Sequence, residues 1–229
     1  MPNLIHLFPL TVFRSSISVA PDERAHMVNA IVEMGQTRVN QKRPGVSWTG
    51  DLNGHELLHN DPRFATLFTR FERPLHDYLD LFHIDRNRVR LHFTRSWGTL
   101  SSRGDSTQSH RHVQSHISLV YYLKKPSDSS GISFLNKEAP NQFAPNLFDD
   151  AMRKAGVLKL DHQSNAQRIY VEPSEDDVLI FPSQALHEIP TNHSSDLRVS
   201  IACDIVMTVR NSAELEFLLP DPSTWRSAN

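Results

Sequence analysis

The stretch HRHVQSHISLVYYL, residues 110–123, carries the strongest indication of the fold of this chain. Its second half, residues 117–123, is a run of β-branched, aromatic and other apolar residues, which predicts a buried β-strand. Its first half carries two imidazoles, His110 and His112. Side chains two apart on an extended chain point to the same side, so these two rings should project together. The stretch therefore predicts a strand that begins beside a pair of imidazoles.

A third histidine follows another predicted strand. The segment FPSQALHE, residues 181–188, places His187 after an apolar run at 177–181. An H-x-H pair and a distant histidine can hold one divalent ion, and neutral imidazoles suit Fe(II). We therefore interpret His110, His112 and His187 as metal ligands and catalytic residues. Three neutral ligands leave the charge of the ion uncompensated, which favours an anionic chelator such as a 2-oxo acid.

The next apolar run, residues 197–207, predicts a strand with one polar face. In LRVSIACDI, residues 197–205, the side chains of Arg198, Ser200, Ala202 and Asp204 share that face. An arginine binds a carboxylate through two hydrogen bonds, and a neighbouring hydroxyl can add a third. Tyr122, in phase with residues 118 and 120, can donate to the same group. We therefore expect Arg198, Ser200 and Tyr122 to bind a cosubstrate carboxylate.

Each of these residues also has a simpler interpretation. The chain contains 13 histidines, so some fall near each other by chance. A histidine at a strand end is often only a hydrogen-bonded polar residue, and an arginine on a strand often pairs with a surface acid. The ligand set is open as well, because Asp105, His116 or Glu188 could bind the ion or orient an imidazole.

The remaining patterns predict a mainly β chain with helices at the N-terminal end. Apolar spacing and an acidic first turn predict helices at 21–34 and 62–82, the second interrupted by Pro74. Strands are expected at 4–13, 89–93, 117–123, 131–135, 168–171, 177–181 and 197–207. Many short strands separated by turn residues are typical of a sandwich or jelly roll. Loops are expected at 41–54, 97–109 and 136–165, the last with a short helix near 148–155.

The length of 229 residues suits one domain, 1–229. Within it we expect an N-terminal strand and supporting helices at 1–86, a jelly-roll core at 87–210 with a lid-like insertion at 136–165, and a tail at 211–229.

Composition excludes several classes of function. Lys plus Arg total 24 against 26 for Asp plus Glu, and no basic cluster is interleaved with aromatics, so no nucleic-acid partner is expected. No apolar stretch approaches the roughly 20 residues of a membrane helix. The apolar start lacks a basic segment and a cleavage site, so a signal peptide is not expected. The single cysteine, Cys203, fits a buried thiol. We expect a soluble cytoplasmic protein, with the oligomeric state open and a homodimer as one option.

Taken together, the motifs resemble the Fe(II)- and 2-oxoglutarate-dependent oxygenases, most closely a bacterial and phage group with an H-x-H metal motif. The matching segments are LFP at 7–9, WTGD at 48–51, Trp97, H-x-H-x-x-S-x-I-S-x-V-Y-Y-L at 110–123, and FPS…H…R-x-S at 181–200. The wider superfamily has an acidic ligand at position 112, whereas the bacterial and phage group often has histidine there.

The resemblance implies a double-stranded β-helix, a cupin-like jelly roll, around the three histidines. It also implies Arg198 as the clamp for the distal carboxylate of 2-oxoglutarate, assisted by Ser200 and Tyr122. The expected function is hydroxylation of an unactivated C–H bond in a small molecule or peptidyl residue, with Fe(II), 2-oxoglutarate and O2 as cofactor and cosubstrates. The alternatives are a three-histidine dioxygenase that needs no 2-oxo acid, and a non-catalytic metal-binding jelly-roll module.

Overall fold

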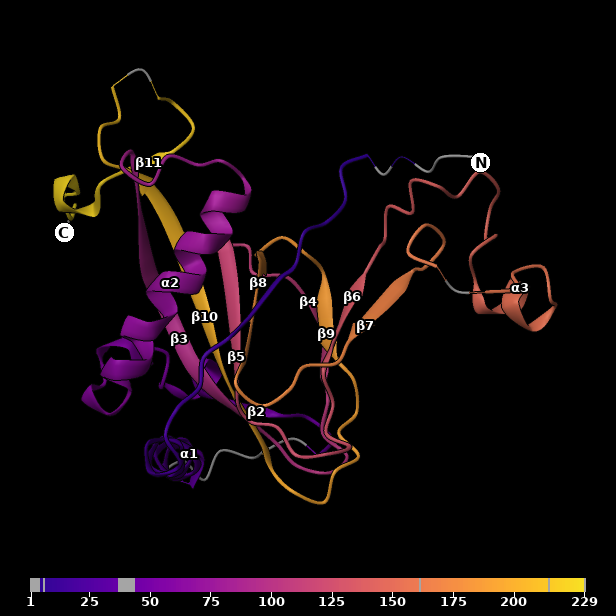
Figure 1. The fold of residues 1–229 in the computed structure, drawn as a ribbon, viewed down its shortest axis with the longest axis horizontal. Coiled ribbons are helices and arrows are strands. Elements are labelled where there is room, and N and C mark those ends of the chain that lie inside the picture. The colour runs from indigo at the N-terminus through magenta and orange to yellow at the C-terminus, as the bar shows by residue number, and fades with distance from the viewer. Residues whose placement is uncertain (1–4, 6, 37–43, 161, 214, 229) are drawn as a thin grey trace.

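The computed structural model describes residues 5, 7–36, 44–160, 162–213 and 215–228. Two largely antiparallel β-sheets dominate it (Figure 1). The large sheet has the order β1 (Phe13–Ser16), β8 (Asp177–Pro182), β5 (Ile117–Lys124), β10 (Arg198–Val209), β3 (Val89–Ser101) and β2 (Trp48–Thr49), and β11 (Leu219–Pro220) pairs in parallel with β10. The small sheet has the order β4 (Thr107–His110), β9 (His187–Ile189), β6 (Ile132–Leu135) and β7 (Arg168–Val171). This arrangement confirms the mainly β fold.

Two helices pack on the large sheet. They are α1 (Pro21–Gln36) and α2 (Ala65–Leu81), and α2 follows a 3-10 turn at Pro62–Phe64. Pro74 lies inside α2 without ending it. Further 3-10 turns lie at Gly50–Asn53, Leu58–Asn60 and Pro222–Thr224. The only other α-helix among the described residues is α3 (Asp150–Lys154), which lies in the long excursion between β6 and β7 (Figure 1).

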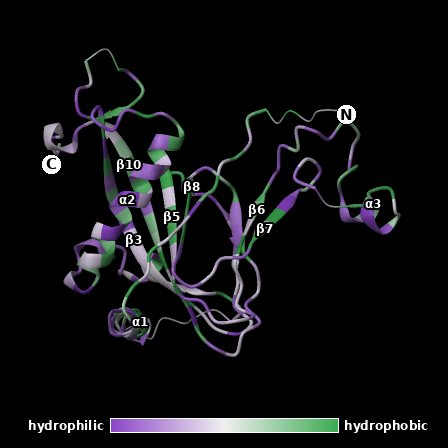
Figure 2. Cartoon of the chain, in the orientation of Figure 1, coloured by the Kyte–Doolittle hydropathy of each residue, from purple (hydrophilic) through white to green (hydrophobic). Residues whose placement is uncertain are grey.

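The two faces of the large sheet have different partners. On β10, Val199, Ile201, Cys203 and Ile205 join an apolar cluster with residues of α1 and α2. A second cluster, between the sheets, contains Tyr122 and Phe181 from the large sheet and Ile132 and Phe134 from β6. Figure 2 shows hydrophobic residues along β5 and β8, which contribute to both clusters. The polar face predicted for β10 therefore looks into the space between the sheets.

The N-terminal strand prediction was wrong. Residues 4 and 6 of the predicted strand 4–13 lie outside the described residues, and residues 7–12 form no strand. The first strand, β1, begins at Phe13. Leu7 and Phe8 are exposed, and Pro9 has no N–H to donate to a neighbouring strand. An extended segment becomes a β-strand only where another strand lies beside it to pair with. Here β8 pairs with residues 13–16 and not with the described residues before them.

Two predicted loops contain strand. In the loop 41–54, residues 41–43 lie outside the described residues, and Trp48–Thr49 pairs with β3. In the loop 97–109, β3 extends to Ser101 and β4 begins at Thr107. The excursion 136–165 is largely irregular, as expected, with residue 161 outside the description. None of the described helices has the length and apolar character needed to cross a membrane.

Candidate active site

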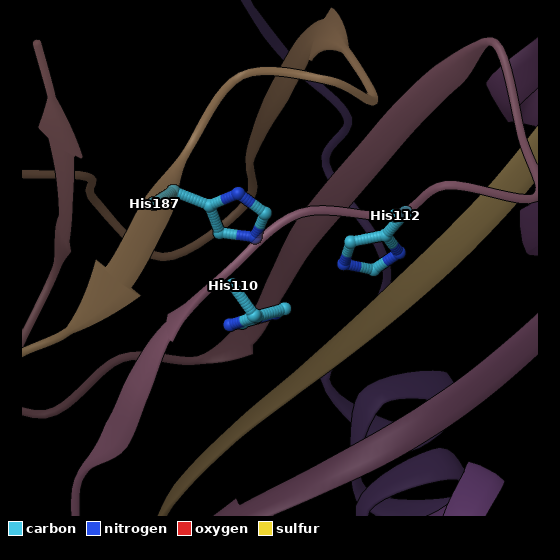
Figure 3. A group of neighbouring side chains, drawn as sticks. All are labelled: His110, His112 and His187. Atoms are coloured by element: carbon cyan, nitrogen blue, oxygen red, sulfur yellow. The ribbon is translucent and has the colours of Figure 1, made fainter. Parts of the chain in front are cut away.

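Three histidines converge between the sheets. His110 ends β4 and pairs directly with His187 at the start of β9, so strand register brings these two rings together. One nitrogen of each of His110, His112 and His187 lies within 4.8 Å of the other two. Figure 3 shows the three rings gathered around a common space. The predicted convergence of two distant segments is therefore present in the structure.

The same ring nitrogen of each histidine is already engaged. Nδ1 of His110 lies 2.8 Å from the carbonyl oxygen of Gln108, and Nδ1 of His187 lies 2.9 Å from that of Ala185. A carbonyl oxygen only accepts, so each Nδ1 carries the proton and donates it. Nδ1 of His112 lies 2.5 Å from Oδ1 of Asp204. In all three rings Nε2 is left with its lone pair, as a metal ligand requires.

Burial keeps two of the rings neutral. His187 is almost fully buried, and burial lowers its pKa to about 4. Burial also lowers the pKa of His110. Removing a charged imidazole from water is unfavourable, and the neighbouring imidazoles add to that effect. Since metal ions bind the neutral ring, these two histidines do not have to lose a proton near neutral pH before binding one.

The structure differs from expectation in how His112 is placed. His110 and His112 were expected to share the face of one strand, but β4 ends at His110 and His112 lies in the connection to β5. The backbone N–H of His112 donates to the carbonyl of Ser183 at 3.0 Å, which anchors this connection beside the end of β8. Its ring approaches that of His110, with a centroid separation of 5.2 Å.

The three alternative ligands lie elsewhere. Glu188 pairs with Arg168 at 3.0 Å. Asp105 accepts from the backbone N–H of Ser102 at 2.7 Å, and Nδ1 of the exposed His116 accepts from the backbone N–H of Met207 at 3.1 Å. Within the described part of the chain, the group of side chains that could hold an ion contains the three histidines and none of these.

A cavity of about 70 Å³ connects the histidines to the predicted clamp residues. His110, His112, His187, Arg198, Ser200 and Tyr122 all line it. A β-bulge lies between Val199 and Ile201 where β10 pairs with β5, so the strand register shifts at Ser200. Bulges re-aim side chains, and this one occurs where both strands face the cavity. Apolar side chains, including Leu119, Ile132 and Phe181, form much of the remaining wall.

Two buried polar groups in this cavity have unused hydrogen-bonding capacity. Arg198 is 1% exposed, and its Nη1 donates to the carbonyl oxygen of Ser130 at 2.9 Å, but its Nε has no partner. The Tyr122 hydroxyl also has none. Burial lowers the pKa of Arg198, yet a guanidinium stays charged at neutral pH. A buried cation and a buried hydroxyl, each with a donor that has no partner, fit an anion such as the carboxylate of 2-oxoglutarate.

The interpretation of the sequence missed the role of Asp204. It placed this residue on the polar face of β10, but only the structure reveals the hydrogen bond to His112. Trp97 also contacts the site, because its ring stacks on that of His112 at 5.6 Å with an interplanar angle of 17°. Asp204 could have been identified from the sequence because its position alternates with Arg198 and Ser200, so that all three side chains lie on the same face of the strand.

Comparison with known proteins agrees with this geometry. Residues 95–204 match the family described as "Putative 2OG-Fe(II) oxygenase". The matched segment, just under half of the chain, is similar to the 2OG-Fe(II) oxygenases. The match covers all three histidines together with Arg198. Among curated proteins, none matches its sequence.

Solved structures share the fold of this chain at low sequence identity. A Pseudomonas putida prolyl-4-hydroxylase has a TM-score of 0.50 at 11% identity, covering 85% of this chain and 92% of its own. HygX from Streptomyces hygroscopicus, solved with nickel and 2-oxoglutarate bound, has a TM-score of 0.53 at 12% identity, covering 86% and 82%. AviO1 from Streptomyces viridochromogenes has a TM-score of 0.54 at 15% identity, covering 86% and 89%. These likenesses confirm the jelly-roll fold.

Proposed function

We propose that this protein is a 2OG-Fe(II) oxygenase that hydroxylates an unactivated C–H bond of a small molecule or a peptidyl residue. In the proposal, His110, His112 and His187 hold Fe(II) through Nε2, and Arg198, Ser200 and Tyr122 hold 2-oxoglutarate. Fe(II) with 2-oxoglutarate and O2 supplies the chemistry that inserts one oxygen atom into the C–H bond, with succinate and CO2 as the other products. One observation carries the proposal: three convergent imidazoles and an unpaired buried guanidinium line the same cavity.

The residues of the chain have separate tasks in this proposal. The three imidazoles hold the ion, and their Nδ1 hydrogen bonds fix the direction of each ring. Arg198 neutralises the far carboxylate and sets the orientation of the cosubstrate. Leu119, Ile132 and Phe181 limit the access of water, which strengthens these electrostatic contacts. Substrate orientation falls to the loops that surround the cavity.

The buried arginine favours this function over the two alternatives. A non-catalytic metal module does not need an anion-binding group at this depth, and a dioxygenase without a 2-oxo acid needs one only for an anionic substrate. Among the described residues, no carboxylate makes an ion pair with Arg198. Because an unpaired buried charge is unfavourable, a bound anion is the simplest partner for it.

The test compares Arg198→Met with Arg168→Met. Arg168 is a surface arginine paired with Glu188, so its substitution is a matched control. Removing one partner of a buried charge pair costs about 2–5 kcal/mol, so Arg198→Met should weaken 2-oxoglutarate binding by about 30-fold or more. Calorimetry on the Co(II)-loaded protein measures the affinity, and an assay of succinate with Fe(II) measures turnover.

The same measurements separate the alternatives. We expect wild type and Arg168→Met to bind 2-oxoglutarate equally and to release succinate. Metal binding without any 2-oxoglutarate binding would refute the proposed function and support one of the alternatives. Equal 2-oxoglutarate affinity in Arg198→Met and wild type would show that the arginine is not the clamp.

A further inference from the structure

Asp204 is fully buried on β10, six residues after Arg198 and on the same face (204 − 198 = 6). The side chains around it present donors. Nδ1 of His112 lies 2.5 Å from Oδ1, and the Ser115 hydroxyl lies 3.1 Å from the same oxygen. The amide of Gln114 donates to Oδ2 at 3.0 Å. A carboxylate is an acceptor on both oxygens, so this set of neighbours is complementary to it.

A cation also faces Asp204. Nη1 of Arg95 lies 3.9 Å from Oδ2, and the guanidinium of Arg95 lies over the ring of Trp97 at 5.5 Å. Arg95 is held in turn by Asp51 at 3.3 Å. Trp97 stacks on His112. These contacts fix the His112 ring both at its Nδ1 edge and across its face.

The three histidines differ in what holds them. His110 and His187 donate to backbone carbonyls, which are neutral, whereas His112 alone donates to a carboxylate. A carboxylate behind a ligating imidazole fixes its tautomer and increases the electron density on the ligating nitrogen. No carboxylate lies in the ligand group of the described residues, so Asp204 brings a negative charge to the triad from outside it.

We propose that Asp204 is the positioning residue of the metal site: its carboxylate orients His112 and supplies, one hydrogen bond behind the ion, the negative charge that the three ligands lack. This inference rests on the proposed function, because it assumes that the triad holds a metal. One strand then performs two tasks: Arg198 near its start holds the cosubstrate, and Asp204 holds a ligand of the ion.

The main variant is Asp204→Asn, which keeps the shape and an acceptor oxygen but removes the charge. The matched control is Asp177→Asn. Asp177 is also buried and accepts from an arginine, Arg14, and from the backbone N–H of Ser174, but it lies at the start of β8, the opposite end from the histidines. The measurement is Co(II) affinity, obtained by titration of the metal-free protein. We expect Asp204→Asn to bind Co(II) about 10–100-fold more weakly than wild type, and Asp177→Asn to remain within about twofold.

A second measurement distinguishes positioning from a general effect on β10. At saturating Co(II), Asp204→Asn should bind 2-oxoglutarate within about threefold of wild type, because Arg198 is unchanged. Equal losses of Co(II) and 2-oxoglutarate affinity would show that the substitution disturbs the strand, and would overturn the proposal.

A third measurement needs no variant. In the Zn(II)-loaded wild type, 15N NMR of the histidine side chains should show a proton on Nδ1 of His112 that exchanges slowly with water, as a buried hydrogen bond to Asp204 requires. Rapid exchange of that proton would overturn the proposal even if Asp204→Asn fails to fold.

The outcomes also separate this inference from the proposed function. The metal site itself would be refuted if wild type bound no Co(II), or if His187→Ala bound Co(II) as tightly as wild type. The role of Asp204 alone would be refuted by a different pattern. In that pattern wild type binds Co(II), His187→Ala does not, and Asp204→Asn binds Co(II) as tightly as wild type.

Discussion

At the scale of single residues, the Tyr122 hydroxyl is buried without a hydrogen-bond partner. Tyr122→Phe removes a buried hydroxyl that makes no hydrogen bond in the protein without 2-oxoglutarate. The free energy of unfolding should therefore stay the same or rise by about 1 kcal/mol. Affinity for 2-oxoglutarate should fall about 10–150-fold, since a hydrogen bond to a charged group contributes ~1.5–3 kcal/mol. Urea unfolding and calorimetry test the two effects. A clear loss of stability with unchanged affinity would contradict the assignment.

The burial of His187 predicts how stability depends on pH. Its pKa is about 4 in the folded protein against 6.5 for an ordinary histidine. As pH falls from 6.5 towards 4, this histidine takes up a proton in the unfolded chain but not in the folded protein. The free energy of unfolding therefore decreases over this range from its value above pH 6.5. Each unit of pKa difference contributes on the order of 1.4 kcal/mol.

Urea unfolding of the metal-free protein at several pH values measures this slope. His187→Gln should reduce it between pH 6.5 and 4, whereas His76→Gln, on the exposed face of α2, should leave it unchanged. Equal slopes for His187→Gln and wild type would show that His187 does not carry the effect.

At the scale of elements, β3 packs closely against α1 at Gly98. A Cβ at this position would lie 2.5 Å from Cγ2 and 2.9 Å from Cγ1 of the buried Ile31. Gly98→Ala should therefore destabilise the protein by about 1–3 kcal/mol through overpacking. In an Ile31→Ala background the same change should cost much less, because the two positions are coupled. A double-mutant cycle by urea unfolding tests this, and additive costs would contradict the packing.

The predictability of elements depended on how strong their local patterns are. β5 and β10 were predicted because apolar residues dominate them and β10 alternates cleanly between faces. β4 and β9 were missed because they have four and three residues and are largely polar. Their pairing arises from tertiary register, which local sequence does not encode.

The candidate site divides in the same way. The three histidines and Arg198 could be selected because H-x-H, a later His and R-x-S are local patterns. The contact between His112 and Asp204 could not, since it joins residues 92 positions apart. The exclusion of Glu188 and His116 likewise depends on which partners each finds in the folded chain.

At the scale of the whole molecule, the excursion between β6 and β7 is nearly independent of the core. Its ends are adjacent, with the N–H of Asn136 donating to the carbonyl of Gln167 at 2.8 Å. α3 buries no residue, and Phe148 belongs to neither apolar cluster. Replacing residues 137–166 with Asn-Gly, which favours a two-residue hairpin, should therefore leave the fold intact.

Thermal unfolding tests this prediction. The shortened chain should melt cooperatively within about 5 °C of wild type, since little apolar surface is removed from the core. It should also bind Co(II) as wild type does. Loss of cooperative unfolding would show that the excursion is needed to complete the core.

The histidines join parts of the chain that belong to different sheets. His110 and His187 lie in the small sheet, and His112 leads into β5 of the large one. An ion held by all three would cross-link the two sheets, so the melting temperature of the protein would depend on the concentration of free iron. At a free-ion concentration 100 times the dissociation constant, the gain is about 2.7 kcal/mol. A chelator should accordingly lower the melting temperature of wild type but not that of His187→Ala.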